Sequence, residues 1–409
     1  MSPGSGGDWL HRHQRPLFLL ASGLSTSGSF AGLTAKGWIL MAGTGNPLLL
    51  ALHFAALALP SLVVSGRAGV LTDRLGCETV LIRAQWGLFS GAALGALAIP
   101  LLQGMGQVVL LLLSTLVVGI SSSFELTARS KYCSLLVERP EQVAPYLASF
   151  SVVFNVGKLV GPPLGGWLVA LSGPAMALAI DAASYLVPIA TVLWLMRPHR
   201  ELEQRSAGGG SASLGAAWRG CGPTLRHVLR FTTVACLVGF FHPGLAPLIA
   251  AEVIGPSPQA LGLFTSVLAA GSITGGVVLQ RNSLALSERP VLLLGGCAVL
   301  VALAQLGMAS FSGGVAPLAM ALLLGAGTAG LLAGSSLILQ VGAPMALRGR
   351  MAGLGQIAFL GGGGVSGLMA AALAMTVGLQ ATFALLGSLG LVVGVLELGR
   401  KGKLRLRSA

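Results

Sequence analysis

The chain has 409 residues, of which 54% are hydrophobic and only 9% are charged, and its mean hydropathy is +0.84. A typical soluble domain is about 25% charged, so this composition excludes a soluble globular protein and indicates a chain that crosses a membrane many times. The formal net charge of +13 would suggest nucleic-acid binding in a soluble protein, so the positions of the basic residues must decide its meaning.

Long apolar runs follow one another along the whole sequence. Each has about 20 residues or more, enough to cross roughly 30 Å of hydrocarbon at about 1.5 Å per residue. The first run follows a polar, basic segment and has no small-residue cleavage site, so it is predicted to be a span and not a signal peptide. The twelve predicted spans are residues 17–42, 47–70, 79–101, 106–128, 144–170, 175–196, 228–250, 259–279, 290–310, 315–338, 352–373 and 377–398.

Lysines and arginines occur in alternate connections between these spans. If the N-terminus is cytoplasmic, every lysine and arginine except Lys36 and Lys158 lies in a segment assigned to the cytoplasm, and the outer loops carry none. We therefore interpret the net charge as a topology signal and not as a nucleic-acid-binding surface. We expect a multi-pass protein of a bacterial-type inner (plasma) membrane, with both termini cytoplasmic.

One long hydrophilic stretch, residues 197–230, separates the sixth and seventh spans. It contains the sequence Gly-Gly-Gly-Ser, which is typical of a flexible linker. We predict an all-α membrane protein with two pseudo-symmetric six-helix bundles. The predicted boundaries are 1–198 for the N-terminal bundle, 199–227 for a cytoplasmic linker and 228–409 for the C-terminal bundle.

The two halves repeat two local patterns. Gly69–Gly76 (GVLTDRLG) follows the second span, and Gly276–Arg281 (GVVLQR) follows the eighth, so that a polar residue and an arginine come four and five positions after a glycine. A glycine-rich segment in the fifth span, Gly157–Gly166, likewise corresponds to Gly361–Gly367 in the eleventh. Internal repeats with interrupted helices are typical of transporters that open a midplane site to each side in turn.

The fifth span contains the sequence GKLVGPPLGG (Gly157–Gly166). Pro162 and Pro163 have no N–H group, so the carbonyl groups four residues earlier lose their helical partners. The glycines reduce one face to backbone, which allows another helix to approach closely. Lys158 adds an ammonium group at membrane depth. We predict a flexing helix at the interface of two moving halves; the alternative is a kinked, tightly packed helix with an isolated lysine.

At these residues the chain resembles the major facilitator superfamily. The pattern G-x-x-x-D-R-x-G is similar to the loop between helices two and three of that family, and G-x-x-x-G-P-x-x-G-G is similar to the helix-five motif of drug/proton antiporters. Leu347–Met351 resembles the loop entering helix eleven in the branch of the enterobactin (siderophore) exporter and macrolide efflux pumps. The resemblance implies a major facilitator fold with a conformational motif made of Gly69, Asp73, Arg74, Gly76, Arg129, Gly157, Gly161, Pro162, Gly165, Gly166, Gln280, Arg281 and Arg350.

Asp73 lies at the C-terminal end of the second span, where the helix dipole disfavours an anion. A positive partner is therefore expected, either Arg74 or Arg83 nearby or the N-terminus of another helix. The resemblance implies the start of helix eleven, at Arg350, as that partner. In this hypothesis Asp73 locks the cytoplasmic side closed; the alternative is a solvated aspartate beside Arg74.

Ser25, Ser29 and Lys36 share one face of the first span, by their helical spacing. A stripe of small polar residues often serves only helix packing. A lysine in a span is costly, about 2.5–3.5 kcal/mol, and such residues usually face the bundle interior or water. We therefore predict that these residues line a substrate cavity, with extension of Lys36 to the outer interface as the alternative.

Acidic and histidine side chains within the spans are few. Glu125 precedes Arg129 by four residues on the fourth span, which fits a structural ion pair as well as a proton site. Asp181 and Lys158 are further candidates for proton coupling, either as a pair or with Asp181 bonded to backbone N–H groups at a helix start. His242, in the seventh span, is a candidate cavity residue that can titrate near neutral pH, or a packed histidine.

The sequence gives little support for an enzyme. The pattern GxGxxG at Gly325–Gly330 lies inside an apolar span with no preceding strand, so it is interpreted as helix packing. There is no phosphate-binding loop, and the cysteines lack metal-ligand spacing. We therefore predict no catalytic residues, no metal and no cofactor. Without an ATP site, uphill transport must use an ion gradient.

We predict a secondary active transporter that works by alternating access. The resemblance implies export by proton antiport, and the two lysines favour a neutral or anionic amphiphilic substrate. A siderophore, a drug or a macrolide-like metabolite is what the resemblance to the branch of the enterobactin exporter and macrolide efflux pumps implies. The alternatives are a facilitator or importer on the same fold, and a membrane sensor or scaffold that transports nothing. We expect a monomer in the lipid bilayer, with protons as coupling ion and no nucleic-acid partner.

Overall fold

The computed structural model describes residues 13–137, 143–195, 218, 222–282, 289–311, 313–343 and 348–400, and the regular elements in these ranges are helices. Most of the predicted linker, 199–227, lies outside them. The elements are α2 (Gln14–Thr44), α3 (Pro47–Ala58), α4 (Pro60–Leu75), α5 (Cys77–Leu101), α6 (Gly104–Leu135), α7 (Val143–Ser184), α8 (Leu186–Ala190), the π-helix η2 (Thr191–Leu195), α11 (Pro223–Gly239), α12 (His242–Val253), α13 (Pro258–Arg281), α15 (Pro290–Ser310), α16 (Ala316–Val341), α17 (Arg348–Val377) and α18 (Leu379–Leu398).

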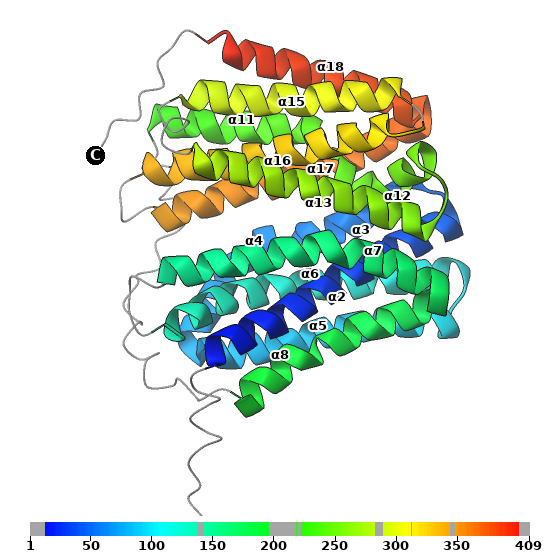
Figure 1. The fold of residues 1–409 in the computed structure, drawn as a ribbon, viewed down its shortest axis with the longest axis vertical. Helices are drawn as coiled ribbons and strands as arrows, with labels where there is room; N and C mark the ends of the chain where they lie inside the picture. Colours follow the sequence, from blue (N-terminus) through cyan, green and yellow to red (C-terminus); the bar gives the residue numbers. More distant parts are fainter. Residues whose placement is uncertain are drawn as a thin grey trace, which may run out of the picture. The chain divides into compact units, whose positions relative to one another are not determined.

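Eleven helical stretches in the described residues are long and apolar enough to cross a membrane. One of them, Val152–Leu193, has 42 residues and would be about 60 Å long as a single rod, roughly twice the thickness of the hydrocarbon core. Its backbone leaves the helical conformation at Gly173, and Figure 1 shows α7 reversing direction along its length before the chain continues into α8. Counted as two spans, this stretch completes the predicted twelve.

Single glycines join consecutive spans without a loop at several places, and two of these glycines occupy corresponding positions in the two halves. Gly173 has φ 80° and ψ 166° within α7, and Gly378, between α17 and α18, has φ 85° and ψ 164°. Only glycine adopts a positive φ with an extended ψ at low cost. The same unusual backbone conformation thus connects the fifth span to the sixth and the eleventh to the twelfth, as expected of an internal repeat.

The helices form two compact units. The first contains α2, α4, α5, α6, α7, α8 and η2, and the second contains α3 together with α11 to α18. The predicted N-terminal bundle included residues 47–58, whereas in the structure α3 packs on α12 and α17 of the second unit. Leu59 separates α3 from α4, so the two parts of the second span belong to different units.

Glycine contacts explain how helices of the second unit pack. A Cβ atom at Gly325 of α16 would overlap the Leu268 carbonyl of α13, and one at Gly327 would lie 2.7 Å from a Val301 methyl group of α15. Gly330 meets Cys297 of α15 in the same way. All three glycines of the GxGxxG pattern therefore allow neighbouring helices to approach closely.

Another closely packed pair of helices in this unit is α15 and α18, which Figure 1 shows side by side.

Candidate functional site

Lys36 is buried in the interior of the first unit. Its side chain is 3% exposed, and its Nζ atom donates a hydrogen bond of 2.7 Å to Ser114 Oγ on α6. Ser114 in turn donates to the Gly91 carbonyl on α5, also at 2.7 Å. The lysine stem passes over Gly95, where a Cβ atom would lie 2.9 Å from Lys36 Cε. The lysine is therefore directed into the bundle and does not extend to the outer interface.

Asp181 carries the carboxyl group that interacts electrostatically with this lysine. Asp181 is 4% exposed. Lys36 is close enough to act on its carboxyl group electrostatically, although no direct ion pair joins the two side chains. Its carboxyl group lies directly against Gly32 of α2, where any Cβ atom would overlap it. The structure places Asp181 well inside the helix that resumes after Gly173, and not at a helix start. Its Oδ1 atom is buried without a hydrogen-bond partner.

Ser25 and Ser29 face the same interior. Ser29 Oγ donates to the Ser25 carbonyl at 2.9 Å and is 2.8 Å from the Tyr185 hydroxyl. Tyr185, which follows α7, is 1% exposed and also interacts with the Asp181 carboxyl group. The predicted polar face of the first span thus contacts the sixth span within one bundle.

Lys158, predicted as a coupling residue, lies apart from these groups. Its side chain is partly buried on α7. Among the described residues, no carboxylate forms an ion pair with it. The structure therefore brings Asp181 close to Lys36 and not to Lys158.

Glu125 belongs to a second buried network near the end of α6. Its carboxylate accepts from Arg129 at 3.0 Å, with side chains only 9% and 13% exposed, and from Gln85 at 3.4 Å. The Arg129 guanidinium lies 5.5 Å from the centre of the Phe150 ring, a cation–π distance. The structural ion pair considered from the sequence is present.

The glycine face of α7 packs against α2. A Cβ atom at Gly157 would lie 2.8 Å from Thr26, and one at Gly161 would lie 2.7 Å from Phe30 Cβ. At Gly165 it would meet the backbone of Ala31. Gly166 and Pro162 are buried, and the backbone stays helical through the prolines, so the interruption of this helix occurs at Gly173 instead.

Asp73 has a partner that the sequence did not suggest. It forms an ion pair of 2.8 Å with Lys131 of α6, and the two side chains are 56% and 20% exposed. Arg74 beside it is exposed. Gly69 has no atom within 4 Å of a Cβ position, and Gly76 has φ 89°, which explains the glycine between α4 and α5.

In the second unit, the corresponding motif is only partly described. Gln280 and Arg281 end α13 and are exposed. Arg350 lies in the first turn of α17, but its side chain is outside the described residues. His242 is 3% exposed at the start of α12, and its ring contacts Phe240 edge-on at 5.2 Å.

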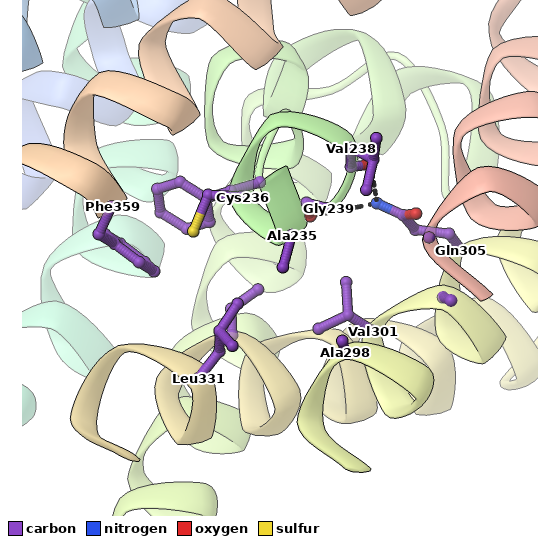
Figure 2. A pocket seen from close by; sticks show the side chains of 13 residues that line it. Ala235, Cys236, Val238, Gly239, Ala298, Val301, Gln305, Leu331 and Phe359 are labelled. Carbon is purple, nitrogen blue, oxygen red and sulfur yellow. Dashed lines mark hydrogen bonds between the residues drawn. The ribbon is translucent and has the colours of Figure 1, made fainter. Parts of the chain in front are cut away.

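A small pocket lies where the seventh span is broken between α11 and α12. Gln305 of α15 donates from Nε2 to the carbonyl groups of Val238 and Gly239, at 3.3 and 3.1 Å. Figure 2 shows these bonds on one side of the pocket, with Cys236 and Phe359 toward the other side. Gln305 is 0% exposed. It replaces the helical partners that these carbonyl groups lose at the break.

One polar cluster in the structure was not predicted from the sequence. His227 Nε2 lies 2.8 and 3.0 Å from the two carboxylate oxygens of Glu397, and Arg400 is 3.8 Å from Glu397. The i, i+3 spacing of Glu397 and Arg400 is a local signal, whereas His227 comes from another span far away in the chain. Among the described residues, no group of three or more histidine, cysteine or acidic side chains could hold a metal ion.

The family model described as "Transmembrane secretion effector" matches residues 12–407. The chain belongs to this family of major facilitator superfamily transporters. It is therefore a multi-pass membrane transporter and not an enzyme. It is also 28% identical over 401 residues to the multidrug efflux pump Tap of Mycolicibacterium fortuitum, covering 93% of this chain and 94% of that protein.

Solved structures agree on the fold. The nucleoside transporter NupG matches with a TM-score of 0.73 at 13% identity, covering 94% of this chain and 99% of that one. A POT family transporter in complex with 5-aminolevulinic acid matches with a TM-score of 0.74 at 12% identity, covering 94% and 95%. The predicted major facilitator fold is confirmed.

Proposed function

We propose that this transmembrane secretion effector exports an amphiphilic small molecule in exchange for protons, by alternating access. The observation that carries the proposal is the pair of buried ionisable groups, Lys36 and Asp181, enclosed by α2, α5, α6 and α7. Ionisable groups inside a membrane bundle are costly and mark ion or substrate pathways. The buried pair therefore supports coupling to an ion gradient.

Two comparisons support the export direction. The similar protein Tap is a multidrug efflux pump, and the matching family is described as a secretion effector. The glycine motif of α7 resembles that of drug/proton antiporters, and its Gly157, Gly161 and Gly165 pack closely against α2. A neutral or anionic substrate, such as a siderophore, fits the two lysines at membrane depth.

The proposed arrangement is a monomer in a bacterial-type plasma membrane, with both termini cytoplasmic. The proposed orientation of the termini rests on the distribution of basic residues. Labelling of single cysteines introduced near each terminus, with a membrane-impermeant reagent on intact and opened cells, tests this orientation. Labelling of either terminus in intact cells would overturn it.

The function is tested with purified protein in liposomes. A pH gradient is imposed, and three probes are followed: ferric enterobactin, radiolabelled erythromycin and ethidium. Gradient-driven movement of a probe against its own concentration gradient supports proton-coupled transport. Movement only down the concentration gradient would identify a facilitator, and absence of flux for a full panel of compounds would favour a sensor or scaffold.

A further inference from the structure

We infer that Asp181 is the residue that binds the transported proton. When the proton leaves, the Asp181 carboxylate forms an ion pair with Lys36. This inference rests on the proposed proton-coupled function, because it names the group that would do the coupling. It is argued from the hydrogen-bond donors around Asp181, all of which lie in the first unit.

The first step is a count of donors. Ser29 can donate to the Ser25 carbonyl, which can only accept. The Tyr185 hydroxyl lies 2.8 Å from Ser29 Oγ, and either oxygen can donate in this bond. Among the described residues, Tyr185 is the one side-chain hydrogen-bond donor that acts on Asp181, and the buried Oδ1 atom has no hydrogen-bond partner. Ser184 donates to the Asp181 backbone carbonyl and not to its side chain.

The second step concerns the other neighbours of Asp181. Gly32 lies against the carboxyl group and has no side chain that could donate a hydrogen bond. The Lys36 ammonium group is directed to Ser114. A carboxylate here would be a buried anion whose Oδ1 atom has no hydrogen-bond partner and which no cation pairs with directly, and this is costly, whereas a neutral carboxylic acid is not. The described arrangement therefore fits the protonated form of Asp181.

The third step follows from losing that proton. When the O–H bond of Asp181 breaks and the proton passes to water, the remaining carboxylate has a strong electrostatic partner in Lys36, with which it already interacts. The flexible lysine stem lets the ammonium group leave Ser114 and pair with Asp181. Proton release would thereby break the contact between α2 and α6 and form one between α2 and α7.

The charged and titratable groups that face Asp181 are few. Lys36 comes from α2 and Tyr185 from the residue after α7; Glu125 on α6 acts on Tyr185 at longer range. The α5 helix contributes Gly91 and Gly95 beside Lys36, and no charged group of α5 is among the influences on Asp181. Asp181 therefore combines deep burial, an Oδ1 atom without a hydrogen-bond partner and a nearby cation.

The first test uses infrared difference spectra of the native protein in lipid, without substrate, recorded between low and high pH. We expect a band of a protonated carboxyl group that is lost in Asp181→Asn and retained in Glu252→Gln, a matched carboxyl-to-amide change at an exposed position of α12. An unchanged band in Asp181→Asn would overturn the assignment. Because no substrate is needed, this result stands apart from the outcome for the proposed function.

The second test separates coupling from transport. Asp181→Asn is expected to lose uphill efflux of the probe compounds and the accompanying proton flux, measured with a pH-sensitive dye inside the liposomes, while keeping exchange of probe between equal concentrations. Since Asp181→Asn leaves Lys36 buried alone, the double variant Lys36→Met/Asp181→Asn keeps the interior neutral and safeguards folding. Uphill efflux with proton flux in either variant would refute the inference, even if the native protein proves to be a proton-coupled exporter.

Discussion

The contact between Gly165 of α7 and Ala31 of α2 allows a quantitative prediction. In Gly165→Ala, the new Cβ atom would lie 2.7 Å from Ala31 Cα and 2.9 Å from its carbonyl carbon. Ordinary contacts begin at 3.4 Å, so the two helices must separate locally by at least 0.7 Å. Backbone atoms cannot rotate away as a side-chain end can, so the overlap can be relieved only by moving a helix.

The cost follows from this separation. A gap of about 0.5–1 Å forfeits roughly a quarter to a half of each dispersion contact, and overpacking of this kind typically costs about 1–3 kcal/mol. For a unit of this size, each kcal/mol lowers the melting temperature by roughly 2–4 °C. We therefore expect Gly165→Ala to unfold several degrees below the native protein.

Thermal unfolding of the purified protein, followed with a dye that reacts with exposed thiols, measures the effect because Cys77, Cys133 and Cys236 are buried. The matched control is Gly66→Ala in α4, where nothing lies within 4 Å of the added Cβ atom. It should melt like the native protein. If Gly165→Ala and Gly66→Ala melted at the same temperature, the close approach of α2 and α7 would be refuted.

Three further predictions concern polar contacts. Arg129→Met should lower the unfolding free energy by about 3–5 kcal/mol, because Glu125 stays buried without its cation; adding Glu125→Gln should restore most of it, and failure to restore would contradict the pairing. Gln305→Leu should cost about 1–3 kcal/mol in the same thermal assay, since carbonyl groups at the helix break lose their donor, and an unchanged melting temperature would argue against this role. Asp73→Asn should change stability by less than about 1 kcal/mol, because its pair with Lys131 is largely exposed, yet slow transport in liposomes; a native rate would remove the proposed lock.

Features that depend on neighbouring residues in the chain could be predicted from the sequence. The apolar runs located the spans, and the i, i+4 spacing located the ion pair of Glu125 with Arg129, because both follow from the geometry of one helix. The glycine pattern in the fifth span predicted a close helix contact. It could not identify α2 as the partner, because backbone exposed by glycine fits any sufficiently smooth helix.

Contacts between distant helices could not be predicted in the same way. Asp181 was expected at a helix start or beside Lys158, because the position of the break at Gly173 and the rotation of the following helix were unknown. The structure instead turns it toward Gly32 and near Lys36. The pair of His227 with Glu397 joins the first helix of the second half to the last, and no local pattern in either helix indicates the other.

The single-glycine turns at Gly173 and Gly378 have a mechanical consequence. Because one residue connects two membrane-crossing rods, the joint has no slack, and neither arm of such a hairpin can slide along the membrane normal without drawing the other with it. The fifth and sixth spans, and likewise the eleventh and twelfth, are thereby constrained to tilt as V-shaped levers. We therefore expect a displacement of the arm that carries Asp181 to move the arm that carries the glycine face.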